Sequence, residues 1–378
     1  MNISRKLTGC AILAASFSLW AADNKGGSYL VYVGTYTNKG KSQGIESLRF
    51  DAATGSLIKM GVAAKSPDPS FLAVHPNRKW LYAVNEAPNT VSAFSINAST
   101  GALTPLNSVS SKGHGPCHLS VDHTGKFVLA ANYGSGSIAS FPIKEDGSLG
   151  EAVSFVQHHG SGADPRRQKG PHAHFITLSA DNRFAIVCDL GLDEVLVYRF
   201  NATDGSLTPN DTPYAKVAPG AGPRHFAFHP SNKFGYVVDE MGETVTAFTW
   251  DAAQGVLRNL QAISALPKGY TGESTGAEIA AHPNGKFLYS SNRGHDSITV
   301  FAINQKKGTL TVVEQAPTLG KEPRSFAIDP TGKYLFAANQ NTDTVVLFKI
   351  DQKTGKLIPS GTQVDVGAPV CVVFVPSA

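Results

Sequence analysis

Residues 226–239, FAFHPSNKFGYVVD, decide the fold, because their pattern of apolar strand, turn, aromatic residue and second apolar strand recurs along the chain. Further copies are residues 279–292 (IAAHPNGKFLYSSN), 326–339 (FAIDPTGKYLFAAN), 72–85 (LAVHPNRKWLYAVN), 119–132 (LSVDHTGKFVLAAN) and 176–189 (ITLSADNRFAIVCD). The shared aromatic falls at Trp80, Phe127, Phe184, Phe234, Phe287 and Tyr334, so the repeat period is 47 to 57 residues. Internal repeats of this length are typical of propellers and other repeat architectures.

Each copy continues in the same way. A third strand follows, such as residues 244–248 (TVTAF), and a hairpin of the D-x-x-x-G-x-L type, such as residues 251–257, leads into a fourth. Four antiparallel strands per period predict one blade of a β-propeller. The strands are apolar on both faces, as expected for sheets packed between neighbouring sheets. Two packed β-sandwiches would also contain many short strands, but their turns would not recur in matching register.

The two ends of the chain supply a further blade. Residues 29–34 (YLVYVG) match a second strand that lacks a first strand, and residues 370–376 (VCVVFVP) match a first strand with nothing after it. We therefore predict an all-β, seven-bladed propeller over residues 23–378, closed into a ring by pairing of the C-terminal strand with the N-terminal strands.

The N-terminus predicts export from the cell. Arg5 and Lys6 precede an apolar run over residues 7–20, and Ala21-Ala22 supply the small residues of a cleavage site, so residues 1–22 are expected to be a secretory signal peptide. Residues 7–10 (LTGC) resemble a lipoprotein processing box, but they leave too little room for its apolar region. No later segment has the roughly 20 apolar residues that cross a bilayer. We expect a periplasmic or secreted protein without a membrane span.

Charge and cysteine content exclude other classes. The net charge of +4 is small and scattered, which argues against nucleic-acid binding. Removal of the signal leaves three cysteines, Cys117, Cys188 and Cys371, an odd number without metal-binding spacing. We expect them to be buried and to form no disulfide framework.

The repeat also predicts where a functional site lies, because equivalent positions differ where a site requires it. The starts of the innermost strands and the ends of the second strands face the same end of the ring. In consecutive blades these positions are occupied by titratable residues of different types, namely His172, His174, Arg224, Glu240, Glu278 and Arg293. Converging groups of this kind favour general acid–base chemistry with recognition of an oxyanion or carboxylate.

Other interpretations apply to several of these residues. The Asn or Asp that ends each second strand suits turn formation, and His75, His229 and His282 are expected to be structural at the opposite end of the ring. An Arg224–Glu240 pair could simply line a wet channel. The long basic segment at residues 157–170 is either a flap over the site or a solvated insertion. We expect no cofactor and no metal, although His172, His174 and His225 leave a metal open.

These same residues carry a family likeness. The chain resembles the lactonase family of seven-bladed propellers, which includes 6-phosphogluconolactonases of the propeller type and carboxymuconate cyclases. The matching motifs are residues 33–37 (VGTYT), Arg167-Gln168 with residues 171–174 (PHAH), 222–225 (GPRH), 275–279 (TGAEI) and 291–298 (SNRGHDSI). The resemblance implies catalytic roles for His172 or His174, Arg224, Glu240 and Arg293. We expect Arg167, His225, Glu278, His295 and Arg324 to bind substrate.

The leading interpretation is hydrolysis of a sugar-acid lactone. One of His172, His174 or Glu240 would take a proton from the attacking water, and Arg224 and Arg293 would stabilise the oxyanion and hold an anionic group. The expected partner is a small lactone or carboxylate. The alternatives are a cyclase or lyase of the carboxymuconate type and a non-enzymatic periplasmic propeller that binds a ligand or scaffolds a complex.

Overall fold

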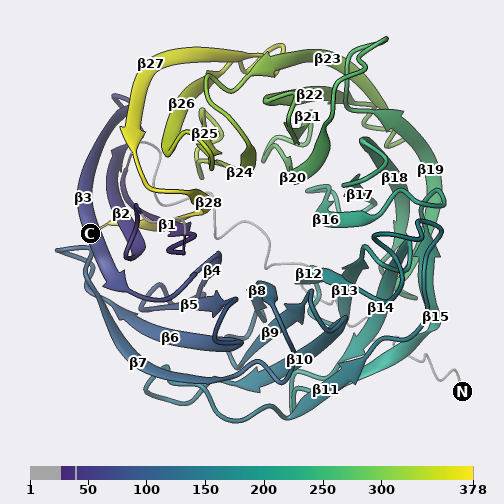
Figure 1. Ribbon diagram of the computed structural model, residues 1–378, viewed down its shortest axis with the longest axis horizontal. Coiled ribbons are helices and arrows are strands. Elements are labelled where there is room, and N and C mark those ends of the chain that lie inside the picture. Colours follow the sequence, from purple (N-terminus) through teal and green to yellow (C-terminus); the bar gives the residue numbers. More distant parts are fainter. Residues whose placement is uncertain (1–26, 39–40, 378) are drawn as a thin grey trace, which may run out of the picture.

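The strands and turns of the repeat form a ring of seven sheets in the computed structural model, each sheet having four antiparallel strands. The structure describes residues 27–38 and 41–377, so the expected signal peptide lies outside the described residues. Figure 1 shows the sheets arranged as blades around a central axis, with the innermost strands nearest the middle. The predicted fold class is confirmed.

Within each blade the four strands lie side by side, in order from the axis to the rim. The innermost strands are β28 (Pro369–Pro376), β4 (Phe71–Val74), β8 (Pro116–Val121), β12 (Ala173–Leu178), β16 (Pro223–Phe228), β20 (Thr275–Ala281) and β24 (Pro323–Ile328). The second strands are β1 (Ser28–Thr35), β5 (Trp80–Asn85), β9 (Phe127–Asn132), β13 (Phe184–Asp189), β17 (Phe234–Asp239), β21 (Phe287–Arg293) and β25 (Tyr334–Asn339). In six blades the aromatic residue of the repeat is thus the first residue of the second strand.

The outer half of each blade is formed by the remaining strands. The third strands are β2 (Gly44–Asp51), β6 (Thr90–Ile96), β10 (Ser137–Pro142), β14 (Glu194–Phe200), β18 (Thr244–Asp251), β22 (Ser297–Ile303) and β26 (Thr344–Ile350). The rim strands are β3 (Ser56–Lys65), β7 (Leu103–Ser110), β11 (Ser154–Gln157), β15 (Leu207–Lys216), β19 (Val256–Ser264), β23 (Leu310–Pro317) and β27 (Leu357–Asp365).

The ring is closed by strands from the two ends of the chain. β28 pairs antiparallel with β1, from Tyr29 opposite Pro376 to Gly34 opposite Cys371. Figure 1 shows this pair as a yellow strand beside a purple one. The closure confirms the prediction from residues 29–34 and 370–376, and it completes the seventh four-stranded sheet.

Apolar side chains fill the spaces between successive blades. Phe50 of one blade lies 4.9 Å from Phe336 of its neighbour, measured between ring centroids, and both are fully buried. Cys117, Cys188 and Cys371 are buried free thiols, as predicted. This packing on both faces explains why the strands lack the alternation of a one-sided sheet.

Three histidines that were expected to be structural connect neighbouring blades. Each lies in the turn after an innermost strand, and its Nε2–H donates a hydrogen bond to the carbonyl oxygen of a glycine in the equivalent turn of the next blade. The pairs are His75 with Gly125 at 2.9 Å, His229 with Gly285 at 2.8 Å and His282 with Gly332 at 2.7 Å. Gly125 has φ of +72°, and a Cβ there would lie 2.5 Å from the His75 ring, so only glycine fits.

Candidate active site

The functional side chains reach the axis because the innermost strands are bulged. In β8, β12, β16 and β24 the register shifts at one residue, which is left without a partner on the second strand; the four residues are Cys117, His174, Arg224 and Arg324. All four stand ten positions before the aromatic residue of their repeat. A β-bulge re-aims a side chain away from the regular alternation of a strand. Here it turns polar groups out of the spaces between blades and toward the channel.

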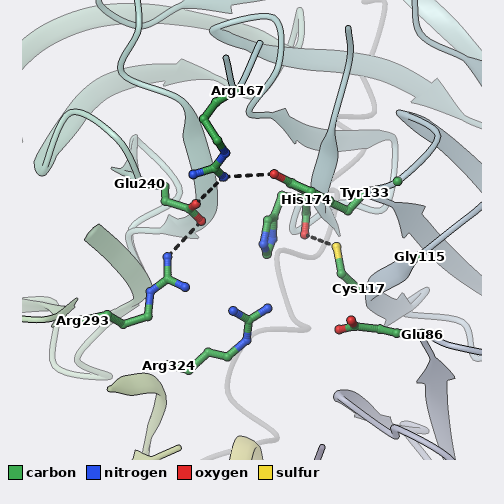
Figure 2. Close-up of a pocket in the computed structure, with 10 residues that line it drawn as sticks. Glu86, Gly115, Cys117, Tyr133, Arg167, His174, Glu240, Arg293 and Arg324 are labelled. Atoms are coloured by element: carbon green, nitrogen blue, oxygen red, sulfur yellow. Dashed lines mark hydrogen bonds and ion pairs between the residues drawn. The ribbon is translucent and has the colours of Figure 1, made fainter. Parts of the chain in front are cut away.

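A cavity of about 420 Å³ lies at the end of the channel where these strands begin. Its wall also contains residues at or just beyond the ends of the second strands, and Figure 2 shows side chains of both sets around the same space. The lining residues are Glu86, Gly115, Cys117, Tyr133, Gly134, Arg167, His174, Glu240, Arg293 and Arg324. The expectation that both sets of positions face one end of the ring agrees with this lining.

Glu240 is the centre of the charged network. Its Oε1 accepts a hydrogen bond from Arg167 Nη2 at 2.8 Å, while its Oε2 lies 3.0 Å from Arg224 Nε and 3.1 Å from Arg293 Nη2. Burial raises the pKa of Glu240, but Arg293 and Arg224 outweigh burial and lower it to about 2. A carboxylate held by three guanidinium groups is a poor proton acceptor. The structure therefore favours Glu240 as a group that orients arginines rather than as the base.

The four arginines differ in what they can reach. Arg224 is fully buried behind Glu240, where its Nη1 donates to the carbonyl oxygen of Ala277 at 2.5 Å, and it does not line the main cavity. Arg167, Arg293 and Arg324 do line it. Arg224 was expected to contact the substrate, but the structure places it outside the lining of this cavity.

In the described part of the chain, Arg324 differs from the neighbouring arginines because no ion pair involves it. Its guanidinium carbon lies 5.3 Å from the centroid of the Tyr36 ring, and the Tyr36 hydroxyl donates to Glu86 Oε1 at 2.9 Å. Within residues 27–38 and 41–377, no carboxylate forms an ion pair with Arg324, whereas Arg167, Arg224 and Arg293 all contact Glu240. Figure 2 shows the Arg324 side chain pointing into the cavity. An anionic group of a ligand would complete its coordination.

His174 is the histidine that the structure brings into the cavity. Its ring meets the Tyr133 ring edge-on, with centroids 5.4 Å apart. Burial, reinforced by the charge of Arg224, lowers the pKa of His174 well below 6.5, so the imidazole is neutral at pH 7. His172 is not among the lining residues. Its ring stacks on Tyr133 and its Nδ1–H donates to the Tyr133 carbonyl oxygen at 2.9 Å.

The long segment before β12 contributes Arg167 to the site. Gln168 is buried, and its Nε2 donates to the Leu190 carbonyl oxygen and to Asp193 Oδ1, both at 2.7 Å. Asp164 Oδ1 accepts the backbone N–H of Arg167 at 2.8 Å. The anchored segment places Arg167 Nη2 within 3.0 Å of the Tyr133 hydroxyl. Of the two interpretations weighed for residues 157–170, this placement favours a flap over the site.

His225 and Glu278 form a pair beneath the cavity. Neither lines it, and His225 Nδ1 lies 2.8 Å from Glu278 Oε1. Beside them the His118 ring packs between Phe71 and Phe175, with centroid distances of 4.0 and 4.1 Å. The structure therefore does not place His225 and Glu278 in direct contact with a ligand in this cavity.

His295, which was expected to bind substrate, is also absent from the lining. It follows Arg293 by two residues, and its Nδ1 lies 2.6 Å from Ser297 Oγ while its ring meets Tyr270 edge-on at 4.8 Å. Among the described residues, no three His, Cys, Asp or Glu side chains are grouped in a way that could hold a metal ion.

Sequence reasoning missed Glu86, Cys117 and Tyr133 as lining residues. Cys117 stands at the bulge position of its blade, and Glu86 and Tyr133 stand where Glu240 stands in theirs. The equivalence of positions between blades could therefore have identified them. It could not have identified Arg167, because residues 157–170 have no counterpart in the other blades.

The chain is similar to known proteins over nearly its whole length. The family model described as "Lactonase, 7-bladed beta-propeller" matches residues 30–374. The 6-phosphogluconolactonase of Bacillus subtilis is 42% identical over 348 residues, which cover 92% of this chain and 98% of that protein. A crystal structure of a putative 6-phosphogluconolactonase from Bacteroides fragilis has a TM-score of 0.87 and 36% identity, covering 94% of this chain and 99% of that one. The structure of a periplasmic gluconolactonase from Pseudomonas aeruginosa has a TM-score of 0.88 and 32% identity, covering 93% and 100%.

Proposed function

The chain belongs to the lactonase family of seven-bladed β-propellers, and we propose that it opens a sugar-acid lactone by attack of water within the cavity at the mouth of its channel. It is a lactone hydrolase of the 6-phosphogluconolactonase type. The roles given below to its side chains are our proposal.

The charge of the cavity is the observation that supports the assignment of these roles. Three guanidinium groups (Arg167, Arg293 and Arg324) and two carboxylates (Glu86 and Glu240) line it, which leaves one net positive charge. Attack of water on a lactone carbonyl creates a negative charge on the carbonyl oxygen. Preorganised donors aimed at that oxygen lower the barrier, because the charge develops mainly in the transition state. An excess of positive charge is what this reaction requires.

We assign the base to His174 and oxyanion stabilisation to Arg293. Of the two ring nitrogens of His174, Nδ1 is buried without a hydrogen-bond partner, so Nε2 is the nitrogen left to face the cavity. Arg293 is held by Glu240 and by the carbonyl oxygen of Gly276, at 3.1 Å in both cases. No carboxylate of the described residues forms an ion pair with Arg324, and we assign this arginine to an anionic substituent of the substrate, such as a phosphate.

The reaction balances without a cofactor. The oxygen of water bonds to the carbonyl carbon, the bond from that carbon to the ring oxygen breaks, and the ring oxygen leaves as a hydroxyl group. The product is a hydroxy acid that ionises at neutral pH, so one proton is released per lactone opened.

The rate of lactone opening can be measured from the protons that the reaction releases. The purified protein is tested on gluconolactone with and without a 6-phosphate, and the rate of spontaneous opening is subtracted. Arg293→Ala should lower the catalysed rate on the order of 100-fold. Arg199→Ala is the matched control, because Arg199 is exposed on β14 and paired only with Asp211. Full activity of Arg293→Ala would remove Arg293 from the mechanism, and inactivity of the wild type on every lactone would refute the substrate class.

We also propose that the protein works in the periplasm or outside the cell. The support is the signal-like character of residues 1–22, together with the likeness to a structure described as a periplasmic gluconolactonase. Cell fractionation tests the proposal. The full chain should be found outside the cytoplasm with a mass that corresponds to cleavage after Ala22, and a chain lacking residues 2–22 should stay in the cytoplasm. Retention of the full chain in the cytoplasm would refute export.

A further inference from the structure

A second, much smaller cavity lies directly beneath the main one. It has about 10 Å³ open to the centre of a water molecule. Glu86, Cys117, His174 and Arg324 line both cavities, so the two are adjacent. The remaining lining residues of the lower cavity are Ser70, Phe71, Arg224, His225 and Val370. This volume is about what a single water molecule needs.

Three polar atoms from different blades lack partners around this lower cavity. Ser70 Oγ, His174 Nδ1 and His225 Nε2 belong to residues that line it, and each is buried without a hydrogen-bond partner among residues 27–38 and 41–377. Buried polar groups are nearly always hydrogen-bonded, and internal water molecules commonly satisfy two to four of them. The lower cavity thus has the size and the polar surroundings of a site for one ordered water.

The geometry points to a proton relay: we propose that a water in the lower cavity connects His174 to the His225–Glu278 pair, so that His225 and Glu278 position the base for lactone hydrolysis. This inference rests on the proposed role of His174. The rings of His174 and His225 meet edge-on with centroids 5.2 Å apart, and both line the lower cavity, so one water beside the two rings can bridge their nitrogens. On its far side, His225 Nδ1 lies 2.8 Å from Glu278 Oε1.

The relay moves protons without loss or gain. The attacking water gives a proton to His174 Nε2, and His174 Nδ1 gives its proton to the water of the lower cavity. That water passes a proton to His225 Nε2, and the Nδ1 proton of His225 goes to Glu278. When the ring oxygen leaves, the same transfers run backwards and deliver one proton to it. The net reaction remains one lactone and one water forming one hydroxy acid.

The surroundings of the pair decide the pH at which it can accept a proton. Burial lowers the pKa of His225 well below 6.5, and Arg224 on the same strand and Arg324 on β24 lower it further. Burial raises the pKa of Glu278 to about 7. Arg224 and His118 oppose that rise, as do the N–H of Ile279, which donates to Oε1, and the Ser325 hydroxyl, which donates to Oε2 at 3.3 Å.

The other charges that face His225 are Glu240 and Arg293, with opposite effects on its pKa. Because Glu278 must be ionised to receive the proton, the relay operates above about pH 7 and fails as the pH falls through that value.

The test is the pH dependence of kcat in matched variants. The wild type should rise to a plateau through about pH 7, because Glu278 ionises there. Glu278→Gln keeps the shape of the side chain but cannot accept a proton, so it should lower the plateau on the order of 100-fold and remove the rise. KM should change less than about twofold, because Glu278 does not line the substrate cavity.

Two further variants distinguish a loss of the relay from a loss of folding. Ser325→Ala removes a hydrogen bond to ionised Glu278, so the rise should move to higher pH while the plateau stays. His118→Asn is the control for folding, because His118 is buried beside His225 and does not line the lower cavity. It keeps an acceptor for the N–H of Ile176 and should keep the wild-type plateau. Because His118 also opposes the raised pKa of Glu278, the rise should move to higher pH, as in Ser325→Ala. A rise that persists in Glu278→Gln, or that stays in place in Ser325→Ala, overturns the relay.

Two readouts do not depend on turnover. Infrared spectroscopy should show a protonated carboxyl group that titrates near pH 7 and is missing in Glu278→Gln. A crystal structure should show a water within hydrogen-bond distance of both His174 Nδ1 and His225 Nε2. Absence of either overturns the relay even if the wild type hydrolyses lactones. Inactivity of the wild type toward every lactone refutes the proposed function, and with it the role given to His174, whatever these two readouts show.

Discussion

Replacing Glu240 by glutamine tests how the site holds its arginines in place. Glu240 is buried, with only 6% of its surface exposed, and its two oxygens contact Arg167, Arg224 and Arg293. Glutamine has the same shape but no charge. The substitution therefore leaves three guanidinium groups, one of them fully buried, without their carboxylate. Removing one partner from a buried ion pair costs more than the net value of the pair, because the other charge stays buried.

The pKa of Glu240 gives the size of the effect. It falls from 4.5 to about 2 on folding, a difference of about 2.5 units. At 1.36 kcal/mol per unit, ionised Glu240 adds about 3 kcal/mol to the free energy of unfolding at pH 7. Unfolding entropies of roughly 2.1 cal/mol/K per residue over about 350 residues give about 0.7 kcal/mol/K, so the melting temperature should drop by about 4 °C.

The lowered pKa of Glu240 also determines how its contribution to the free energy of unfolding changes with pH. A lowered pKa in the folded state means that the stabilisation is complete above pH 4.5 and disappears as the pH falls toward 2. The difference in melting temperature between the wild type and Glu240→Gln should therefore be constant from pH 7 to about 5 and shrink at lower pH. Calorimetry at pH 7, 5, 4 and 3 measures it.

A control for this prediction is Glu151→Gln. Glu151 accepts from Lys112 at 2.8 Å, the same distance as from Glu240 to Arg167, but its side chain is 73% exposed. An exposed pair contributes little, so this variant should melt within about 1 °C of the wild type, corresponding to less than about 1 kcal/mol. Equal shifts in the two variants, or a Glu240→Gln shift that does not change between pH 7 and 3, would refute the reasoning.

Three other outcomes follow from the structure. Removing residues 369–378 deletes β28, including the buried side chains of Val370, Cys371, Val372 and Val375. Burial of these four side chains contributes on the order of 6–12 kcal/mol, so the truncated chain should not melt cooperatively. An unchanged melting curve would contradict ring closure by β28. Arg324→Gln should raise KM at least about tenfold for a phosphorylated lactone and much less for the unphosphorylated one, because the lost guanidinium group is a partner for an anion. Equal effects on both substrates in initial-rate assays would exclude that role. Gln168→Ala removes three hydrogen bonds, two of them fully buried and each worth about 1 kcal/mol, so amide exchange of residues 158–170 should accelerate and KM should rise. Unchanged exchange would show that other contacts anchor the segment.

The fold could be predicted from the sequence because every level of the repeat agrees. The aromatic residue marks the first position of the second strand, from Trp80 in β5 to Tyr334 in β25. Five residues earlier, the turn carries a histidine or aspartate in five copies and Ser179 in the sixth, and its side chain forms hydrogen bonds that fix the turn. Even the weakest copy, residues 176–189, forms β12 and β13 with the register of the others. Local propensity, turn chemistry and burial point to the same strands, which is the condition under which sequence specifies structure.

The site could be predicted only in part, because two physical facts are not visible in the repeat. One is depth: Arg224 and Arg293 both contact Glu240, but Arg224 lies behind the carboxylate and Arg293 in front of it. The other is the direction of neighbouring residues in a turn, which sends Arg293 into the cavity and the His295 ring toward Tyr270. Both depend on tertiary packing, so spacing along the chain cannot separate them.

The bulges explain why the chemistry gathers at one position of the repeat. In a regular strand of a propeller, alternate side chains enter the spaces on either side of the blade, and those spaces are filled with apolar groups. A polar residue there would be buried without water. The extra residue of a bulge is exempt from this alternation, so Cys117, His174, Arg224 and Arg324 can vary without disturbing the packing between blades. β4 has no such register shift, and there the serine before the strand, Ser70, contributes only a hydroxyl to the lower cavity. The repeat thus keeps the ring constant while the bulge position carries the residues that differ from blade to blade.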